Sequence, residues 1–183
     1  MHEVSLNQTI KDYLTGKEIE LTTFEDIRQA LAKMLVEEKG YPKEYIVPKE
    51  QIELILEDEI FPITLDFVVY DEQKNPLLLL AFCFGEIASF VRQYIAVARL
   101  HVPFIPLILL TDTKDAYLIQ SGDKKVLQRG YFGIPTYQEL KELAKKAPSF
   151  SLDEKKKKAE TCLAHAYFAL SGPCCSATGT CDK

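Results

Sequence analysis

Near the start of the chain, the spacing of apolar residues predicts two helices. Between residues 24 and 35, apolar side chains recur every three or four positions and would form one face of a helix. Thr22 and Glu25 fit a capping box at the start of this helix, and Gly40 ends it. Residues 5–15 are predicted to form a shorter helix that comes first.

The middle of the chain has the pattern of a sheet interrupted by one helix. Residues 86–100 carry apolar side chains at helical spacing and would cross over the sheet, so the strands before and after them should be parallel. The preceding segment is apolar almost throughout, which is typical of a strand buried on both faces. We expect the strands of this sheet at residues 51–56, 62–70, 77–84 and 104–112.

After the sheet, a hairpin and a helix are predicted to complete an α/β domain, residues 1–148. The hairpin is expected from residue 116 to residue 130. The helix should begin at Thr136, because Glu139 three residues later fits a second capping box. The remaining residues, 149–183, are predicted to form a Lys- and Cys-rich C-terminal helix and tail.

Charge and hydropathy narrow the classes of function. The 183 residues carry a net charge of −5, and no stretch of the sequence forms a basic stripe. Dedicated DNA-binding proteins usually present a basic surface to the phosphates, so any contact with DNA is expected to be weak. The longest apolar run, residues 76–85, is too short to span a bilayer, and the first residues lack the pattern of a secretory signal. We therefore expect a cytoplasmic protein without membrane contacts.

Several segments, taken in order, carry a resemblance to a known family. The predicted succession of helix, two strands, turn, strand, helix and strand resembles the core of PD-(D/E)XK nucleases. The segments that carry it are residues 24–28, 40–44, 65–71 and 76–80, together with Gln93. They are most similar to the N-terminal nuclease domain of type I restriction enzyme R subunits and its stand-alone relatives. The resemblance implies a restriction-endonuclease-like α/β fold with a mixed central sheet flanked by helices.

The resemblance also implies a Mg²⁺ site, from which this chain departs. Such nucleases hold the ion between an Asp on one strand and a Glu on the next, with a Lys two residues after the Glu. Asp66 stands at the position of the Asp, whereas Ala81 and Cys83 stand at the positions of the Glu and the Lys. Neither residue supplies a carboxylate or an ammonium group, so the resemblance implies a vestigial site around Asp66.

Other polar residues are candidates to rebuild a site around Asp66. Glu25 and Glu86 could replace the lost carboxylate, although a capping box explains the first and the first turn of a helix explains the second. Gln93 stands where the family has a glutamine expected to contact nucleic acid, and a helix-to-sheet hydrogen bond explains it equally well. Asp66 itself is also explained by hydrogen bonds to the backbone or to Thr64.

The tail contains a cluster of soft metal ligands. Cys162 and His165 lie three residues apart on the predicted helix, and Cys174, Cys175 and Cys181 follow. These side chains could hold Zn²⁺ or an Fe–S cluster, but they include no Cys-x-x-Cys pair and fit no standard zinc finger. A tail with free thiols explains them as well. No other cofactor is expected, except Mg²⁺ if the chain is an active nuclease.

Three functions fit the sequence. The first is a catalytically degenerate nuclease-fold domain in nucleic-acid-associated binding or assembly, with a protein partner or a second copy of the chain and with DNA bound weakly. The second is an active Mg²⁺-dependent endonuclease with a rearranged site. The third is a metal- or redox-responsive interaction protein that works through its tail. We favour the first, because phosphodiester cleavage needs a charge clamp that Ala81 and Cys83 do not supply.

Overall fold

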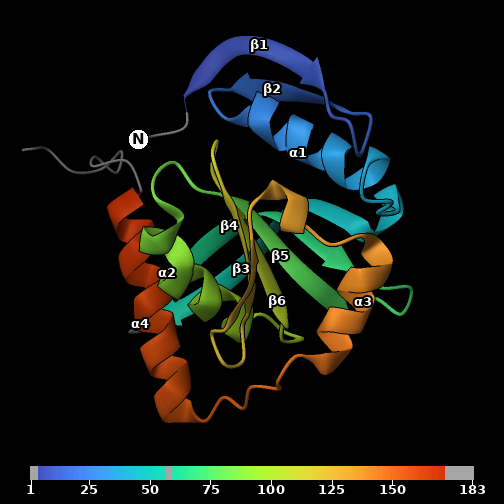
Figure 1. Ribbon diagram of the computed structural model, residues 1–183. Helices are drawn as coiled ribbons and strands as arrows, with labels where there is room; N and C mark the ends of the chain where they lie inside the picture. The colour runs from blue at the N-terminus through green and yellow to red at the C-terminus, as the bar shows by residue number, and fades with distance from the viewer. Residues whose placement is uncertain (1–3, 57–58, 172–183) are drawn as a thin grey trace, which may run out of the picture.

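A six-stranded mixed sheet forms the centre of the computed structural model, which describes residues 4–56 and 59–171 (Figure 1). Its strands lie side by side in the order β3–β4–β5–β6–β7–β8. β5 and β6 are parallel, as predicted from the helix between them, and the other neighbouring pairs are antiparallel. The strands are β3 (Ile46–Leu56), β4 (Glu59–Tyr70), β5 (Pro76–Phe82), β6 (Leu107–Thr111), β7 (Ala116–Gln120) and β8 (Val126–Arg129).

Helices cover both faces of the sheet and divide the core in two. α1 (Glu25–Glu37) and α3 (Tyr137–Lys146) pack on one face, and α2 (Ile87–Leu100) and α4 (Glu154–Ser171) pack on the other. All residues of β5 are buried, and from Leu78 to Phe82 they alternate between the two cores because successive strand side chains point to opposite faces. Within the described residues, no helix is both long enough and apolar enough to cross a membrane.

The N-terminal segment is a hairpin, so the helix expected at residues 5–15 is wrong. β1 (Ser5–Lys11) pairs antiparallel with β2 (Glu18–Thr22) in a separate two-stranded sheet. Gly16, expected to end a helix, lies in the hairpin turn with a φ of 70°, a conformation that glycine adopts without strain. Figure 1 shows this hairpin lying over α1.

The two predicted capping boxes have different outcomes. At α3, Thr136 and Glu139 exchange hydrogen bonds between side chain and backbone, which confirms the box. At α1, the residue that precedes the helix is Phe24 and it makes no side-chain cap, so the box of Thr22 and Glu25 is wrong. Glu25 is 1% exposed and pairs with Arg28 and Lys49 instead.

Buried contacts hold α4 against the domain. The guanidinium of Arg99 on α2 donates to two backbone carbonyl oxygens in the turn between β7 and β8, each at 2.8 Å, and pairs with Glu160 of α4 at 2.5 Å. The Phe150 ring lies 3.9 Å from the same guanidinium carbon. A Cβ at Gly122 would lie 2.3 Å from the Pro148 carbonyl oxygen, so the backbone at Pro148 packs directly against the turn between β7 and β8. The domain boundary at Pro148 stays a prediction.

A buried histidine joins the end of α2 to β3. His101 Nε2 lies 2.8 Å from Glu50 Oε1, and Nδ1 lies 2.6 Å from the Pro103 carbonyl oxygen. Burial alone would lower the pKa of His101, but the Glu50 and Pro103 oxygens outweigh burial and raise it above its ordinary 6.5. Burial would raise the pKa of Glu50, but hydrogen bonds from His101 and Tyr70 lower it below its ordinary 4.5.

We expect this pair to make the free energy of unfolding depend on pH. The raised pKa of His101 contributes stability that is complete below about pH 6.5 and is lost as the pH rises through its folded-state value. The lowered pKa of Glu50 contributes stability that is complete above about pH 4.5 and is lost as the pH falls. In urea unfolding, His101→Gln should therefore differ from the wild type more at about pH 5.5 than at about pH 9. Equal differences at both pH values would contradict a protonated His101.

Candidate functional site

The candidate site lies where the start of α1 meets the middle of β4. In a regular strand Leu65 and Phe67 would face the same side, yet Leu65 belongs to the core under α2 and Phe67 to the core under α1. Opposite this irregularity on β3, Lys49 has a φ of 52°, in the left-handed region that is strained for a residue with a side chain. As a result, Lys49 and Asp66 both reach the start of α1.

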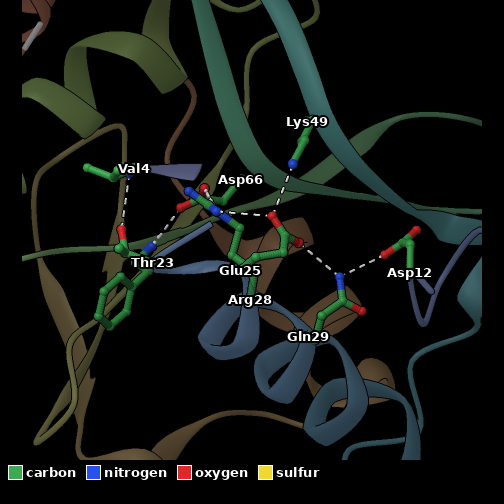
Figure 2. A network of polar contacts seen from close by, with 9 residues as sticks. Val4, Asp12, Thr23, Glu25, Arg28, Gln29, Lys49 and Asp66 are labelled. Carbon is green, nitrogen blue, oxygen red and sulfur yellow. Dashed lines mark hydrogen bonds and ion pairs between the residues drawn. The ribbon is translucent and has the colours of Figure 1, made fainter. Parts of the chain in front are cut away.

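Two carboxylates and two cations meet at this point. Arg28 Nε donates to Asp66 Oδ1 at 2.7 Å, and Arg28 Nη1 lies 3.2 Å from Glu25 Oε2. Lys49 Nζ lies 3.0 Å from the same Glu25 oxygen. Figure 2 shows Arg28 bonded to both carboxylates while Lys49 approaches Glu25 from the other side. The side chains of Glu25 and Arg28 are only 2% and 9% exposed, and charges buried to this degree need such partners.

The N-terminal hairpin extends this network. Gln29 Nε2 donates to Glu25 Oε1 and to Asp12 Oδ1, each at 2.9 Å. Thr15 donates to the other Asp12 oxygen through its backbone N–H and its hydroxyl. Burial raises the pKa of Asp12, but these hydrogen bonds outweigh it and lower the pKa, so Asp12 is a carboxylate at neutral pH. A pocket of about 150 Å³ lies between the hairpin, α1, β3 and β4.

The backbone of β5 completes the surroundings of Asp66, but no β5 side chain adds charge. The Phe82 N–H donates to Asp66 Oδ2 at 2.9 Å, and the register of β4 and β5 places Ala81 next to Asp66. The side chains of Ala81 and Cys83 belong to the core under α2, on the face opposite α1. Leu80 and Phe82 face α1. The Glu and Lys positions of Glu-x-Lys can be aligned with Ala81 and Cys83 or with Leu80 and Phe82. In either alignment, the side chains of this strand bring no charge to the site.

Two candidate residues, Glu86 and Gln93, lie outside the network. Glu86 directly precedes α2, is exposed, and lines a separate cleft. The side-chain amide of Gln93 is oriented so that its nitrogen faces acceptors. This nitrogen donates to the carbonyl oxygens of Phe90, at 2.7 Å, and Ser89, at 3.1 Å. This contact lies within α2 rather than reaching the sheet. A role for Gln93 in nucleic-acid binding stays a prediction.

The predicted metal ligands of the tail are only partly described. Cys162 on α4 is exposed, and the His165 ring packs against Phe61 with centroids 4.1 Å apart. Cys174, Cys175 and Cys181 lie outside the described residues. Among the residues that are described, no group of three or more His, Cys, Asp or Glu side chains is arranged to hold a metal ion. The Zn²⁺ or Fe–S site therefore stays a prediction.

The residues at Asp66 do not fit the Mg²⁺ ion that the nuclease fold implies. Mg²⁺ demands near-octahedral oxygen coordination, usually with one or two carboxylates and several waters. Here Glu25 and Asp66 are both bonded to Arg28, so an ion between them would lie beside a guanidinium and the Lys49 ammonium. Arg28 and Lys49 already supply the positive charge that a metal would bring.

Five residues of the network were not predicted as site residues: Asp12, Thr15, Arg28, Gln29 and Lys49. Arg28 lies three positions after Glu25, the spacing at which helix side chains face each other, so this pair has a signal in the sequence. Lys49 reaches the site through a left-handed backbone conformation, for which the sequence has no signal. Asp12 and Gln29 depend on how the hairpin packs on α1.

The family of the chain follows from a comparison with family models. The model of the type I restriction enzyme R protein N terminus matches residues 23–135, more than half of the chain. The chain therefore belongs to this family, and the restriction-endonuclease-like α/β fold predicted from the sequence is confirmed. The β1–β2 hairpin precedes the matched residues. No curated protein matches the chain in sequence.

Two solved restriction-enzyme structures are similar to the chain. The match to the cryo-EM structure of a DrdV–DNA complex has 15% identity and a TM-score of 0.43, and covers 66% of this chain and 11% of that chain. The match to the type IIG restriction endonuclease BpuSI has 17% identity and a TM-score of 0.40, and covers 79% of this chain and 16% of that chain. The chain thus spans a small part of each of these longer proteins.

Proposed function

We propose that the chain is a catalytically degenerate nuclease-fold domain that acts in binding or assembly. One observation carries this proposal: the carboxylates at the nuclease site are neutralised by the protein's own cations. Arg28 is bonded to both Glu25 and Asp66, and Lys49 is bonded to Glu25. A cleaving site needs carboxylates that bind a divalent ion and a group that activates water. Here the two carboxylates already form ion pairs with Arg28 and Lys49.

An active nuclease with a rearranged site is the alternative. Lys49 favours it, because its ammonium group brings a lysine to a site that also holds Glu25 and Asp66. For cleavage, Arg28 would have to release both carboxylates so that they could hold a metal ion. That release would leave buried charges unpaired, which is costly for a guanidinium side chain that is 9% exposed. We therefore rank this alternative second.

A nuclease assay separates these two functions. Supercoiled plasmid is incubated with the wild type and with Asp66→Asn in Mg²⁺ or Mn²⁺, and we expect equal background cleavage by both. Calorimetric titration should detect no Mn²⁺ binding that depends on Asp66. Arg28→Met removes the guanidinium from both carboxylates, although Glu25 keeps Lys49, so the variant should bind Mn²⁺ more tightly than the wild type. Cleavage by the wild type that Asp66→Asn abolishes would overturn the proposal.

The assembly role concerns nucleic-acid-associated complexes in the cytoplasm. Membership in the family of type I restriction enzyme R protein N termini supports this setting. The net charge of −5 disfavours strong direct binding to DNA, because phosphate contacts depend on positive charge. Contact with DNA is therefore expected to be weak and to vanish as the salt concentration rises. A protein partner is the more suitable ligand.

A further inference from the structure

A second hollow lies beside the candidate site and takes no part in the network around Asp66. We call it the β5–β6 cleft. Its volume is about 650 Å³, and it opens where the parallel strands β5 and β6 end and α2 begins. In α/β sheets, ligands characteristically bind outside the carboxyl ends of the strands. The residues that define the cleft here are Phe24, Phe84, Glu86, Asp112, Asp115 and Tyr117.

One wall of the cleft is aromatic. The rings of Phe24 and Phe84 lie 5.0 Å apart, and Phe84 meets Phe90 edge-on at 6.2 Å. Phe84 is nevertheless 36% exposed, so part of a large apolar ring is left in contact with water. The neighbouring rings hold Phe84 in place. It therefore offers a fixed platform on which a side chain of a partner can pack.

The rim of the cleft is acidic. Glu86, Asp112 and Asp115 line it, and Lys114 is the cation among the lining residues. Backbone N–H groups of the turn donate to Asp112 at 2.6 and 2.7 Å. Others donate to Asp115 at 2.8 and 2.9 Å. These hydrogen bonds fix the two carboxylates in place without adding a positive side chain to balance them.

The carboxylates of this rim also act on two neighbouring groups, Cys83 and Tyr131. Burial raises the pKa of the Cys83 thiol to about 12, and the charges of Asp66 and Asp112 add to this effect. Burial also raises the pKa of Tyr131, and the charges of Asp112 and Asp115 raise it further. Both groups are neutral at physiological pH even with their ordinary pKa values, and the nearby carboxylates act in the same direction as burial.

We propose that the β5–β6 cleft docks a basic segment of a partner protein, with an arginine or an apolar side chain against Phe84 and positive charges beside Glu86 and Asp112. Aromatic ring faces attract guanidinium and ammonium groups, and the carboxylates pair with them. Nucleic acid does not suit the cleft, because its phosphates would meet three carboxylates and one lysine. A small free cation would leave most of the 650 Å³ unfilled. This inference names the partner class of the proposed assembly role and rests on that role.

Selection from a random 12-residue peptide library displayed on phage tests this site. The full chain is the bait, and we expect enriched peptides with a net positive charge and an arginine or lysine beside an apolar residue. A synthetic peptide of the enriched sequence should bind Phe84→Ala and Glu86→Lys at least about tenfold more weakly than the wild type. Glu86 is exposed, so Glu86→Lys should keep the fold. Phe132→Ala is the matched control, since Phe132 is fully exposed and outside the cleft.

Several outcomes would overturn the docking site. These are enrichment of acidic peptides, no enrichment at all, or enriched peptides that bind both cleft variants as tightly as the wild type. A 12-nucleotide single strand that binds the wild type and loses affinity with Phe84→Ala would show a nucleic-acid site instead. The proposed degeneracy is tested at Asp66 by cleavage and Mn²⁺ binding, so its failure is distinguishable from failure of the cleft.

Discussion

Arg28→Met is expected to lower the free energy of unfolding by about 3 kcal/mol, the typical cost of removing one partner from a buried ion pair. Asp66 would lose its 2.7 Å bond to the guanidinium, and Glu25, whose side chain is 2% exposed, would keep Lys49 but lose Arg28. Methionine fills much of the same space, so the loss should reflect charge rather than a cavity. Urea unfolding followed by circular dichroism measures it.

Lys33→Met is the matched control for this variant. Lys33 lies on the same helix, is 61% exposed, and pairs with Glu37 at 3.9 Å, so its replacement should cost less than about 0.5 kcal/mol. Adding Asp66→Asn to Arg28→Met should recover part of the loss, because an amide needs no counter-charge. A loss of less than about 1 kcal/mol in Arg28→Met would mean that the guanidinium does not hold these acids.

Arg99→Met should have a similarly large effect, about 3 kcal/mol, through the attachment of α4. The variant leaves Glu160, whose side chain is 11% exposed, without its partner, and removes two hydrogen bonds to backbone carbonyl oxygens. Because Arg99 links α2 to α4, we also expect faster trypsin cleavage within residues 155–158. The measurements are urea unfolding and limited proteolysis of the full chain.

The control for Arg99 is Lys156→Met. Lys156 lies on α4 and pairs with Asp153 at 3.4 Å, but it is 54% exposed, so the change in stability should stay below about 0.5 kcal/mol. Because Lys156→Met itself removes a trypsin site, it serves as the control for stability only, and the wild type is the reference for proteolysis. If α4 is as resistant to trypsin in Arg99→Met as in the wild type, the attachment of this helix does not depend on Arg99.

The sheet could be predicted because its strands carry strong signals. β5 is apolar throughout, and the helical spacing after it indicates a crossover to a parallel neighbour. β3 was harder, since it begins at Ile46 rather than at the expected residue 51. Pro48 argues against a strand, and the left-handed conformation of Lys49 has no signature. The helix predicted at residues 5–15 is wrong because the strands of the β1–β2 hairpin do not alternate clearly between apolar and polar residues.

The candidate site could be predicted only in part. The order of the family's motifs identifies Asp66, and Glu25 was a candidate on the first helix. Their common partner, Arg28, is 38 residues from Asp66, and the contact depends on how α1 packs against β4. A single sequence does not show such packing. Glu86 has the right chemistry, but it is exposed and lines a separate cleft at the start of α2.

Anomalous diffraction from crystals soaked in manganese chloride tests most directly whether Arg28 and Lys49 take the place of a metal ion. Neutralisation by these two cations predicts no manganese peak near Asp66, with Arg28 Nε still within hydrogen-bonding distance of the carboxylate. A manganese ion held between Asp66 and Glu25, with the Arg28 side chain turned away, would contradict it.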